Sequence, residues 1–169
     1  MEHRFELSIP ADVVLADLTS ADFLTAFATE VGVEVGSLTS SASGEDPAGQ
    51  ARASMTWSFP TDRPGIPQLA RTLLPDRVEL TWEQAWGLLE GDTARGTLEV
   101  QLTGRPSAVS NGTCRLVVDG SGCALTTDTT TKAALPFPVR GKVESTIDRE
   151  LVGWILSVQA RVLTRRHPG

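Results

Sequence analysis

The residues of this chain that could carry catalytic chemistry are few and widely spaced. His3 and His167 are the two histidines, and each lies near one end of the sequence, where residues are often exposed or mobile. Nucleophilic catalysis needs a histidine held against a serine or cysteine, so neither a Ser-His nor a Cys-His arrangement is expected. No combination of histidine, cysteine and carboxylate has the spacing of a metal site. The sequence therefore predicts no catalytic residues, no metal ligands and no cofactor.

A pair of carboxylates is the second candidate for chemistry. Glu144 and Asp148 stand one helical turn apart in a segment with the pattern of a helix. Two carboxylates at this spacing can divide the roles of acid and base between them. Pairs of this kind on an exposed helix face are far more often solvated than catalytic, so we expect both side chains to point into solvent.

The two cysteines, Cys114 and Cys123, flank a turn signal at residues 119–122. In a hairpin built on this turn, Val118 pairs with Cys123, and Cys114 pairs with a residue near Thr127. The two sulfurs are then offset by about four residues along the ladder, which is beyond the reach of a disulfide. We therefore expect two reduced thiols.

The elements that must position these residues follow from the hydrophobic pattern. Alternating apolar and polar residues predict strands over 3–9, 33–42, 49–59, 78–88, 93–103, 106–118 and 123–134. Two short helices follow the first strand, and Ser20 is the expected N-cap of the second, with Phe23, Leu24 and Phe27 facing inward. Successive hairpins indicate an antiparallel meander of about seven strands rather than βαβ units.

A long amphipathic helix over 139–165 ends the chain. It would be about 40 Å long at 1.5 Å per residue, and its apolar face repeats with the helical period at Val143, Ile147, Leu151, Trp154, Ile155, Val158 and Val162. A helix of this length needs a wide apolar partner, which a strongly curved antiparallel sheet supplies. The sequence thus predicts a single α+β domain over 1–169, in which such a sheet wraps around the helix. This architecture often leaves a cavity between the sheet and the helix.

The residues expected to face this space are mostly apolar, with a few polar groups among them. From the sheet they are Met55, Trp57, Trp82, Gln84, Trp86, Leu98, Val100, Cys114, Leu116, Leu125, Thr127 and Thr129, and from the helix Ile147, Leu151 and Trp154. Hydroxyls and an amide among indoles are typical of a ligand pocket, although the same residues can be core that packs against the helix. Buried threonines, including Thr131, would each need a hydrogen-bond partner, which water or a ligand could supply.

Two arginines and one proline-rich interval complete the candidate site. Arg52 and Arg95 fall on the outer alternation of their strands, and a one-residue bulge would turn either one inward as an anchor for a carboxylate. Residues 60–75 carry four prolines with apolar residues between them. They are either a plug in the open end of the sheet or a lid over a ligand entrance, and the lid residues would be Ile66, Leu69 and Leu73.

Charge and hydropathy narrow the class of partner. A net charge of −6 argues against nucleic acid and anionic membranes, which favour basic proteins. No apolar run is long enough to span a membrane, and charged residues stand where a signal peptide would be apolar. We expect a cytoplasmic protein, either a monomer or a weak dimer.

The chain resembles an uncharacterised family of the START-like (SRPBCC, helix-grip) superfamily, a domain of unknown function found in high-GC Gram-positive bacteria. The residues that carry the resemblance are 5–11, Leu74-Pro75-Asp76, 83–87, Gly96-Thr97-Leu98 and the strand-to-helix junction 135–144. Since that superfamily includes lipid carriers and aromatase/cyclases, the resemblance implies the fold and a cavity but transfers no active residues.

We expect the protein to bind a small hydrophobic or amphipathic molecule between the sheet and the helix, without catalysis. Two alternatives remain open. One is an enzyme of the polyketide cyclase/aromatase kind, which would need a titratable group with a perturbed pKa inside the cavity. The other is a protein-interaction module with a filled core, which would need an exposed apolar patch.

Overall fold

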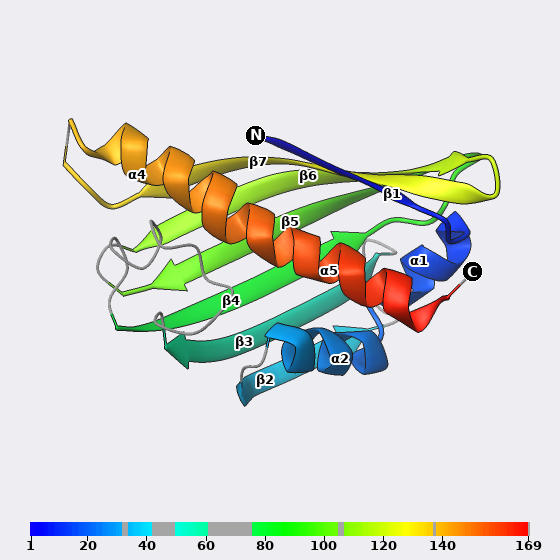
Figure 1. Ribbon diagram of the computed structural model, residues 1–169, viewed down its shortest axis with the longest axis horizontal. Coiled ribbons are helices and arrows are strands. Elements are labelled where there is room, and N and C mark those ends of the chain that lie inside the picture. The colour runs from blue at the N-terminus through cyan, green and yellow to red at the C-terminus, as the bar shows by residue number, and fades with distance from the viewer. Residues whose placement is uncertain (32–33, 42–49, 61–75, 105–106, 137, 169) are drawn as a thin grey trace.

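One antiparallel sheet crossed by a long C-terminal helix forms the framework of the molecule (Figure 1). The computed structural model describes residues 1–31, 34–41, 50–60, 76–104, 107–136 and 138–168. Within these ranges seven strands lie in the order β1-β7-β6-β5-β4-β3-β2. They are β1 (Glu2–Leu7), β2 (Glu34–Ser41), β3 (Ala51–Pro60), β4 (Arg77–Trp86), β5 (Thr93–Thr103), β6 (Ala108–Asp119) and β7 (Gly122–Ala133). The predicted α+β helix-grip architecture is confirmed, and each strand ends within two residues of its predicted limits.

The register of the hairpins agrees with the sequence pattern. β6 and β7 are joined by a turn in which Gly120 has a φ of 61°, a conformation that glycine adopts without strain. Val118 pairs with Cys123, and Cys114 pairs with Thr127, as predicted. Both cysteines are free and buried. Because side chains alternate along each strand, one face of the sheet is apolar and lies under the helix.

Two short helices cover one end of the apolar face. α1 (Ala11–Leu18) begins directly after Pro10, and α2 (Ala21–Val31) is capped by Ser20, whose hydroxyl accepts a hydrogen bond from the backbone N–H of Phe23 at 3.1 Å. The predicted cap is therefore confirmed. Phe23 and Phe27 are fully buried and stack with their ring centroids 5.9 Å apart. In Figure 1, α2 lies over the edge of the sheet formed by β2 and β3.

The C-terminal helix has three consecutive parts that form one continuous rod (Figure 1). They are α4 (Arg140–Thr146), a π-helical turn η1 (Ile147–Val152) and α5 (Gly153–Arg166). In the π turn the N–H of Gly153 donates to the carbonyl of Asp148, five residues earlier. The predicted helix and its apolar face are confirmed, whereas the π turn was not predicted, because periodicity does not reveal one extra residue in a helix.

No helix in the described ranges is both long enough and apolar enough to cross a membrane. The predicted lid residues Ile66, Leu69 and Leu73 lie outside the described residues.

Candidate functional site

The apolar face between the sheet and the helix holds the residues predicted to line a pocket. The sheet residues all point to this side and are at most 7% exposed: Met55, Trp57, Trp82, Gln84, Trp86, Leu98, Val100, Cys114, Leu116, Leu125, Thr127, Thr129 and Thr131. From the helix, Ile147 and Leu151 are buried, while Trp154 is half-buried at the border of the core.

The centre of this face is closely packed. Phe27 from α2 meets the rings of Trp57 and Trp82 edge to face, at centroid distances of 6.0 and 5.7 Å. Met55 and Leu80, on the same two strands, have no exposed surface at all. These rings and their neighbours are therefore almost completely shielded from solvent.

Three indole N–H groups in this packed region have no hydrogen-bond partner within the described structure. They belong to Trp57, Trp82 and Trp86, each only 1% exposed. A buried donor without an acceptor costs about 1–3 kcal/mol, and most buried polar groups in proteins are paired. Three such donors therefore stand without an acceptor on one face of the sheet, within the described ranges.

The polar groups next to these indoles already have partners within the protein. Gln84 donates to the carbonyl of Leu18 and accepts a hydrogen bond of 3.1 Å from Gln159 on α5. Ser110 and Thr131 share a hydrogen bond of 2.6 Å.

Two buried threonines of β7 that face the helix also have hydrogen-bond partners within the protein. Thr127 donates to the sulfur of Cys114 at 3.6 Å, and Thr129 donates to Asp148. Cross-strand and helix neighbours therefore supply the hydrogen-bond partners of these buried threonines, so neither water nor a ligand is needed for them.

Trp86 also determines the residue type of its neighbour. It pairs across the strands with Gly96, and a Cβ added to Gly96 would lie 2.7 Å from the indole ring and 2.7 Å from the carbonyl oxygen of Ala85. No side chain fits there while the ring stays in place, so the absence of a side chain at Gly96 gives the indole its position.

A cluster of polar residues that sequence analysis missed lies where the π turn meets β1 and β7. Asp148 is 6% exposed, accepts a hydrogen bond from Thr129, and has its Oδ1 atom 3.6 Å from Nε2 of His3. The chain's α-amino group at Met1 lies 4.0 Å from Oδ2 of Asp148.

This cluster corrects two expectations. Asp148 is not solvated, because its carboxylate points toward β7, and Glu144 is half-buried and accepts the backbone N–H of Ala133 at 2.9 Å. His3 is not an exposed terminal residue, since its side chain is only 12% exposed and its Nε2 atom is buried.

His167 is likewise held in place, at the other end of the helix. Its Nε2 atom lies 2.9 Å from Oδ2 of Asp17 on α1, and Arg166 donates two hydrogen bonds to the same carboxylate at 2.7 and 2.9 Å. Burial alone would raise the pKa of Asp17, but the hydrogen bonds and charges of Arg166 and His167 outweigh it and hold the pKa below its ordinary value. This group ties α5 to α1 and lies apart from the three indoles.

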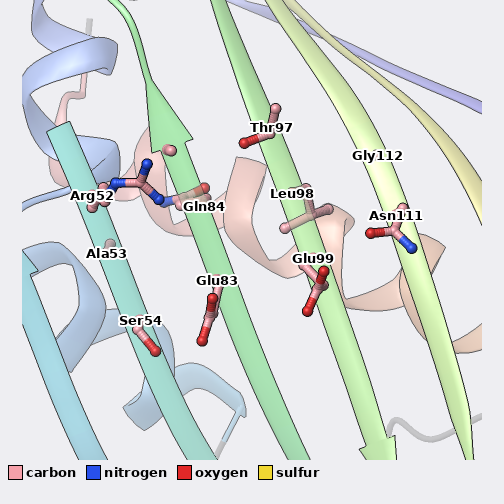
Figure 2. Close-up of a pocket in the computed structure, with 11 residues that line it drawn as sticks. Arg52, Ala53, Ser54, Glu83, Gln84, Thr97, Leu98, Glu99, Asn111 and Gly112 are labelled. Carbon is pink, nitrogen blue, oxygen red and sulfur yellow. The ribbon is translucent and has the colours of Figure 1, made fainter. Parts of the chain in front are cut away.

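A groove of about 660 Å³ lies on the opposite face of the sheet, away from α5 (Figure 2). Its side chains come from four neighbouring strands and are mostly polar: Arg52, Ser54, Glu83, Thr97, Glu99 and Asn111. Arg52 points outward here, as the alternation predicts, and Arg95 is also exposed. A shallow polar groove that is open to solvent does not enclose an apolar ligand, so we do not assign the binding site to it.

Comparison with protein families gives one match, which spans nearly the whole chain. Residues 2–165 match the family described as "Protein of unknown function (DUF2505)". No curated protein matches the chain.

Solved structures of the same fold are numerous but distant in sequence. An uncharacterized protein from Rhizobium leguminosarum has a TM-score of 0.58 and 10% identity, over 98% of this chain and 93% of that one. A norcoclaurine synthase point mutant from Thalictrum flavum, in complex with a transition-state analogue, has a TM-score of 0.52 and 10% identity over 98% and 94%. The di-domain ARO/CYC StfQ of the steffimycin biosynthetic pathway has a TM-score of 0.53 and 13% identity, over 98% of this chain and 51% of that one. At these identities the likeness shows a shared helix-grip fold and nothing further.

Proposed function

The chain belongs to the DUF2505 family of proteins of unknown function, and we propose that it binds a small, largely apolar molecule with a polar group between the sheet and α5. Binding is non-catalytic in this proposal. The ligand is held by the apolar side chains of β3, β4 and β5 beneath the helix.

One observation carries the proposal: the three buried indole N–H groups that have no acceptor. Tryptophan buries more area than phenylalanine, but each unpaired indole N–H costs about 1–3 kcal/mol that phenylalanine would avoid. A ligand that brings a hydrogen-bond acceptor would supply the partner that these indole N–H groups lack. The fold supports this reading, because the similar structures include one that holds a transition-state analogue.

The close packing of the ligand-free protein sets a condition on binding. Trp57, Trp82 and Met55 have almost no exposed surface, so a ligand must displace side chains or move the helix away from the sheet. We therefore expect binding to be slower than diffusion allows and to be accompanied by a change in the environment of the tryptophans.

The test uses intrinsic fluorescence, because all four tryptophans lie in or beside this interface. N-Phenyl-1-naphthylamine is an uncharged apolar probe that absorbs where indole emits, so saturable quenching of tryptophan emission with a stoichiometry near one supports an interior site. Two neighbours on β5 supply matched variants: Val100 is buried under the helix, and Gln101 is exposed on the outer face.

Val100→Phe should weaken binding of the probe, whereas Gln101→Phe should not. Thermal unfolding of both variants checks that each is folded, since overpacking a core costs about 1–3 kcal/mol. The proposal is wrong if no apolar probe binds the wild-type protein, or if Gln101→Phe removes binding and Val100→Phe does not.

A further inference from the structure

The unpaired indoles also indicate which chemical class of ligand fits, if the proposed interior site exists. An indole carries one N–H donor and no acceptor. The neighbouring amide and hydroxyl groups are already engaged, Gln84 with Gln159 and Ser110 with Thr131. Beside these indoles the spare hydrogen-bonding capacity therefore consists of donors, and a ligand that fits there must bring an acceptor.

Two of the three indoles form one subsite. Trp82 pairs with Met55 and Trp57 pairs with Leu80 across β3 and β4, so the two tryptophans are diagonal neighbours on the same face. Side chains in this relation stand about 7–8 Å apart at their origins, within reach of a common atom for large rings. Phe27 touches both rings.

Trp86 does not belong to this pair. It lies four residues beyond Trp82 on β4, roughly 13 Å along the strand. The side chain of Gln84 stands between them and is bonded to Leu18 and Gln159. One small polar group therefore reaches Trp57 and Trp82 but not Trp86.

The surroundings of the pair favour an uncharged acceptor. Met55, Leu80, Val100 and Phe27 are apolar and buried. None of the residues described as buried is a lysine or arginine, so a carboxylate placed here would lose its water without gaining a cation, which is costly. A ligand with an ammonium group would find no hydrogen-bond acceptor at the indoles, because an indole offers only an N–H donor.

We propose that the ligand is a neutral, carbonyl-bearing apolar molecule, such as a ketone, ester or lactone, whose oxygen accepts hydrogen bonds from the indole N–H groups of Trp57 and Trp82. The carbonyl oxygen has two lone pairs and accepts both donors at once. The apolar body of the ligand lies against Phe27 and the neighbouring aliphatic side chains.

Three matched probes test this class. Acetylnaphthalene carries a neutral carbonyl acceptor. Ethylnaphthalene has nearly the same shape without an acceptor, and naphthoate carries a charged carboxylate. Equilibrium dialysis against the full-length protein gives the three dissociation constants. We expect the ketone to bind about tenfold tighter than the hydrocarbon, as two modest hydrogen bonds would give, and tighter than the carboxylate.

Variants assign the effect to residues. Trp57→Phe and Trp82→Phe each remove one N–H and keep an aromatic ring, and together they should reduce the tenfold preference to about twofold. Affinity for the hydrocarbon should change little. Glu83→Gln, next to Trp82 but exposed on the other face, should keep the preference. Thermal unfolding without ligand checks that both phenylalanine variants are folded, since the smaller ring loses buried contacts while it removes an unpaired donor.

The possible failures are distinguishable. If none of the three probes binds, the interior site itself is wrong. If the hydrocarbon or the carboxylate binds as tightly as the ketone, the interior site stands but the carbonyl assignment falls. If Trp86→Phe removes the preference and the double variant of Trp57 and Trp82 keeps it, the assignment to this pair is overturned.

Discussion

The imidazole of His3 lies beside Asp148 of the π turn and also close to Gly153, the first residue of α5. Nε2 of His3 is 3.6 Å from Oδ1 of Asp148, and a Cβ added to Gly153 would lie 3.0 Å from Cε1 of His3. The N–H of Gly153 donates to the carbonyl of Asp148. The π turn thus brings a buried carboxylate and a residue without a side chain close to the same imidazole ring. In this way β1 is tied to the C-terminal helix.

The first prediction concerns Gly153. Replacing a helical glycine by alanine normally stabilises a protein by about 0.5–1 kcal/mol. Gly153→Ala should not show this stabilisation and should instead lower the free energy of unfolding, because the new methyl group would press on the ring of His3. Gly141→Ala is the matched control, since no atom beyond its chain neighbours and its own helix backbone lies within 4 Å of the Cβ position there, and it should stabilise the protein. Urea denaturation measures both.

A double-mutant cycle gives the same prediction a second test. In a His3→Ala background the ring is absent, so Gly153→Ala should then behave like Gly141→Ala. Equal effects of Gly153→Ala with and without His3 would show that the ring does not require the glycine.

The second prediction concerns the coupling between Trp86 and Gly96. Gly96→Ala should destabilise the protein by about 1–3 kcal/mol, because the ring of Trp86 and the carbonyl of Ala85 occupy the site of the new methyl group. Trp86→Ala should cost about 3–5 kcal/mol, since the ring is 1% exposed. In the double variant the ring no longer blocks the methyl group, so the combined loss should be smaller than the sum. Strict additivity would exclude the contact.

The sheet and its register could be predicted from sequence because side chains in strands alternate with a strict period of two. Cys114 opposite Thr127 illustrates this, since one turn signal fixed the pairing of two strands. The apolar face of the C-terminal helix was predicted in a similar way, because its apolar residues recur with the helical period. Asp148 shows the limit. It stands three residues before Leu151 and seven before Ile155, which is the spacing of the buried face, yet a lone carboxylate is normally assigned to solvent.

The polar contacts of the interior could not be predicted, because their partners are far apart in sequence. Gln84 and Gln159 are 75 residues apart, and only the placement of α5 over β4 brings them together. The unpaired indoles are a similar case. Sequence shows that Trp57 and Trp82 face inward, but whether an N–H has an acceptor depends on how each ring is turned.

The third prediction concerns thiol reactivity. Burial raises the pKa of Cys114 to about 11, an effect that the hydrogen bond from Thr127 only partly offsets. Burial, and then the charge of Glu6, raise the pKa of Cys123 to about 11. About one thiol in a thousand is then ionised at pH 8, and the thiolate is the reactive form. The native protein should not react with a maleimide within an hour, whereas both thiols should react in denaturant.

Thr113→Cys supplies the control for this reaction. Thr113 precedes Cys114 on β6 but is exposed on the outer face, so its thiol should react with the native protein while Cys114 does not. Stoichiometric labelling of wild-type protein under native conditions would contradict the burial of both cysteines.

The last prediction concerns acid stability and rests on Asp17. Its folded pKa is held below the ordinary value, mainly because hydrogen bonds from Arg166 and His167 outweigh the effect of burial. The unfolded chain titrates near the ordinary value of about 3.9. The stabilisation is therefore fully present above this value and is lost as the pH falls through the lower, folded pKa. Asp17→Asn should cost about 1–3 kcal/mol near pH 6, as charged hydrogen bonds do.

The difference between wild type and Asp17→Asn should shrink as the pH falls from about 4 toward 2, because protonated Asp17 no longer attracts Arg166 or His167. Asp12→Asn is the matched control, on the first turn of the same helix and exposed. It should change the free energy of unfolding by only a few tenths of a kcal/mol near pH 6. Urea denaturation at a series of pH values gives the curves. A difference for Asp17→Asn that stays constant down to about pH 2 would mean that the charge of Asp17 does not tie α5 to α1, and that the Arg166 contact is held by packing alone.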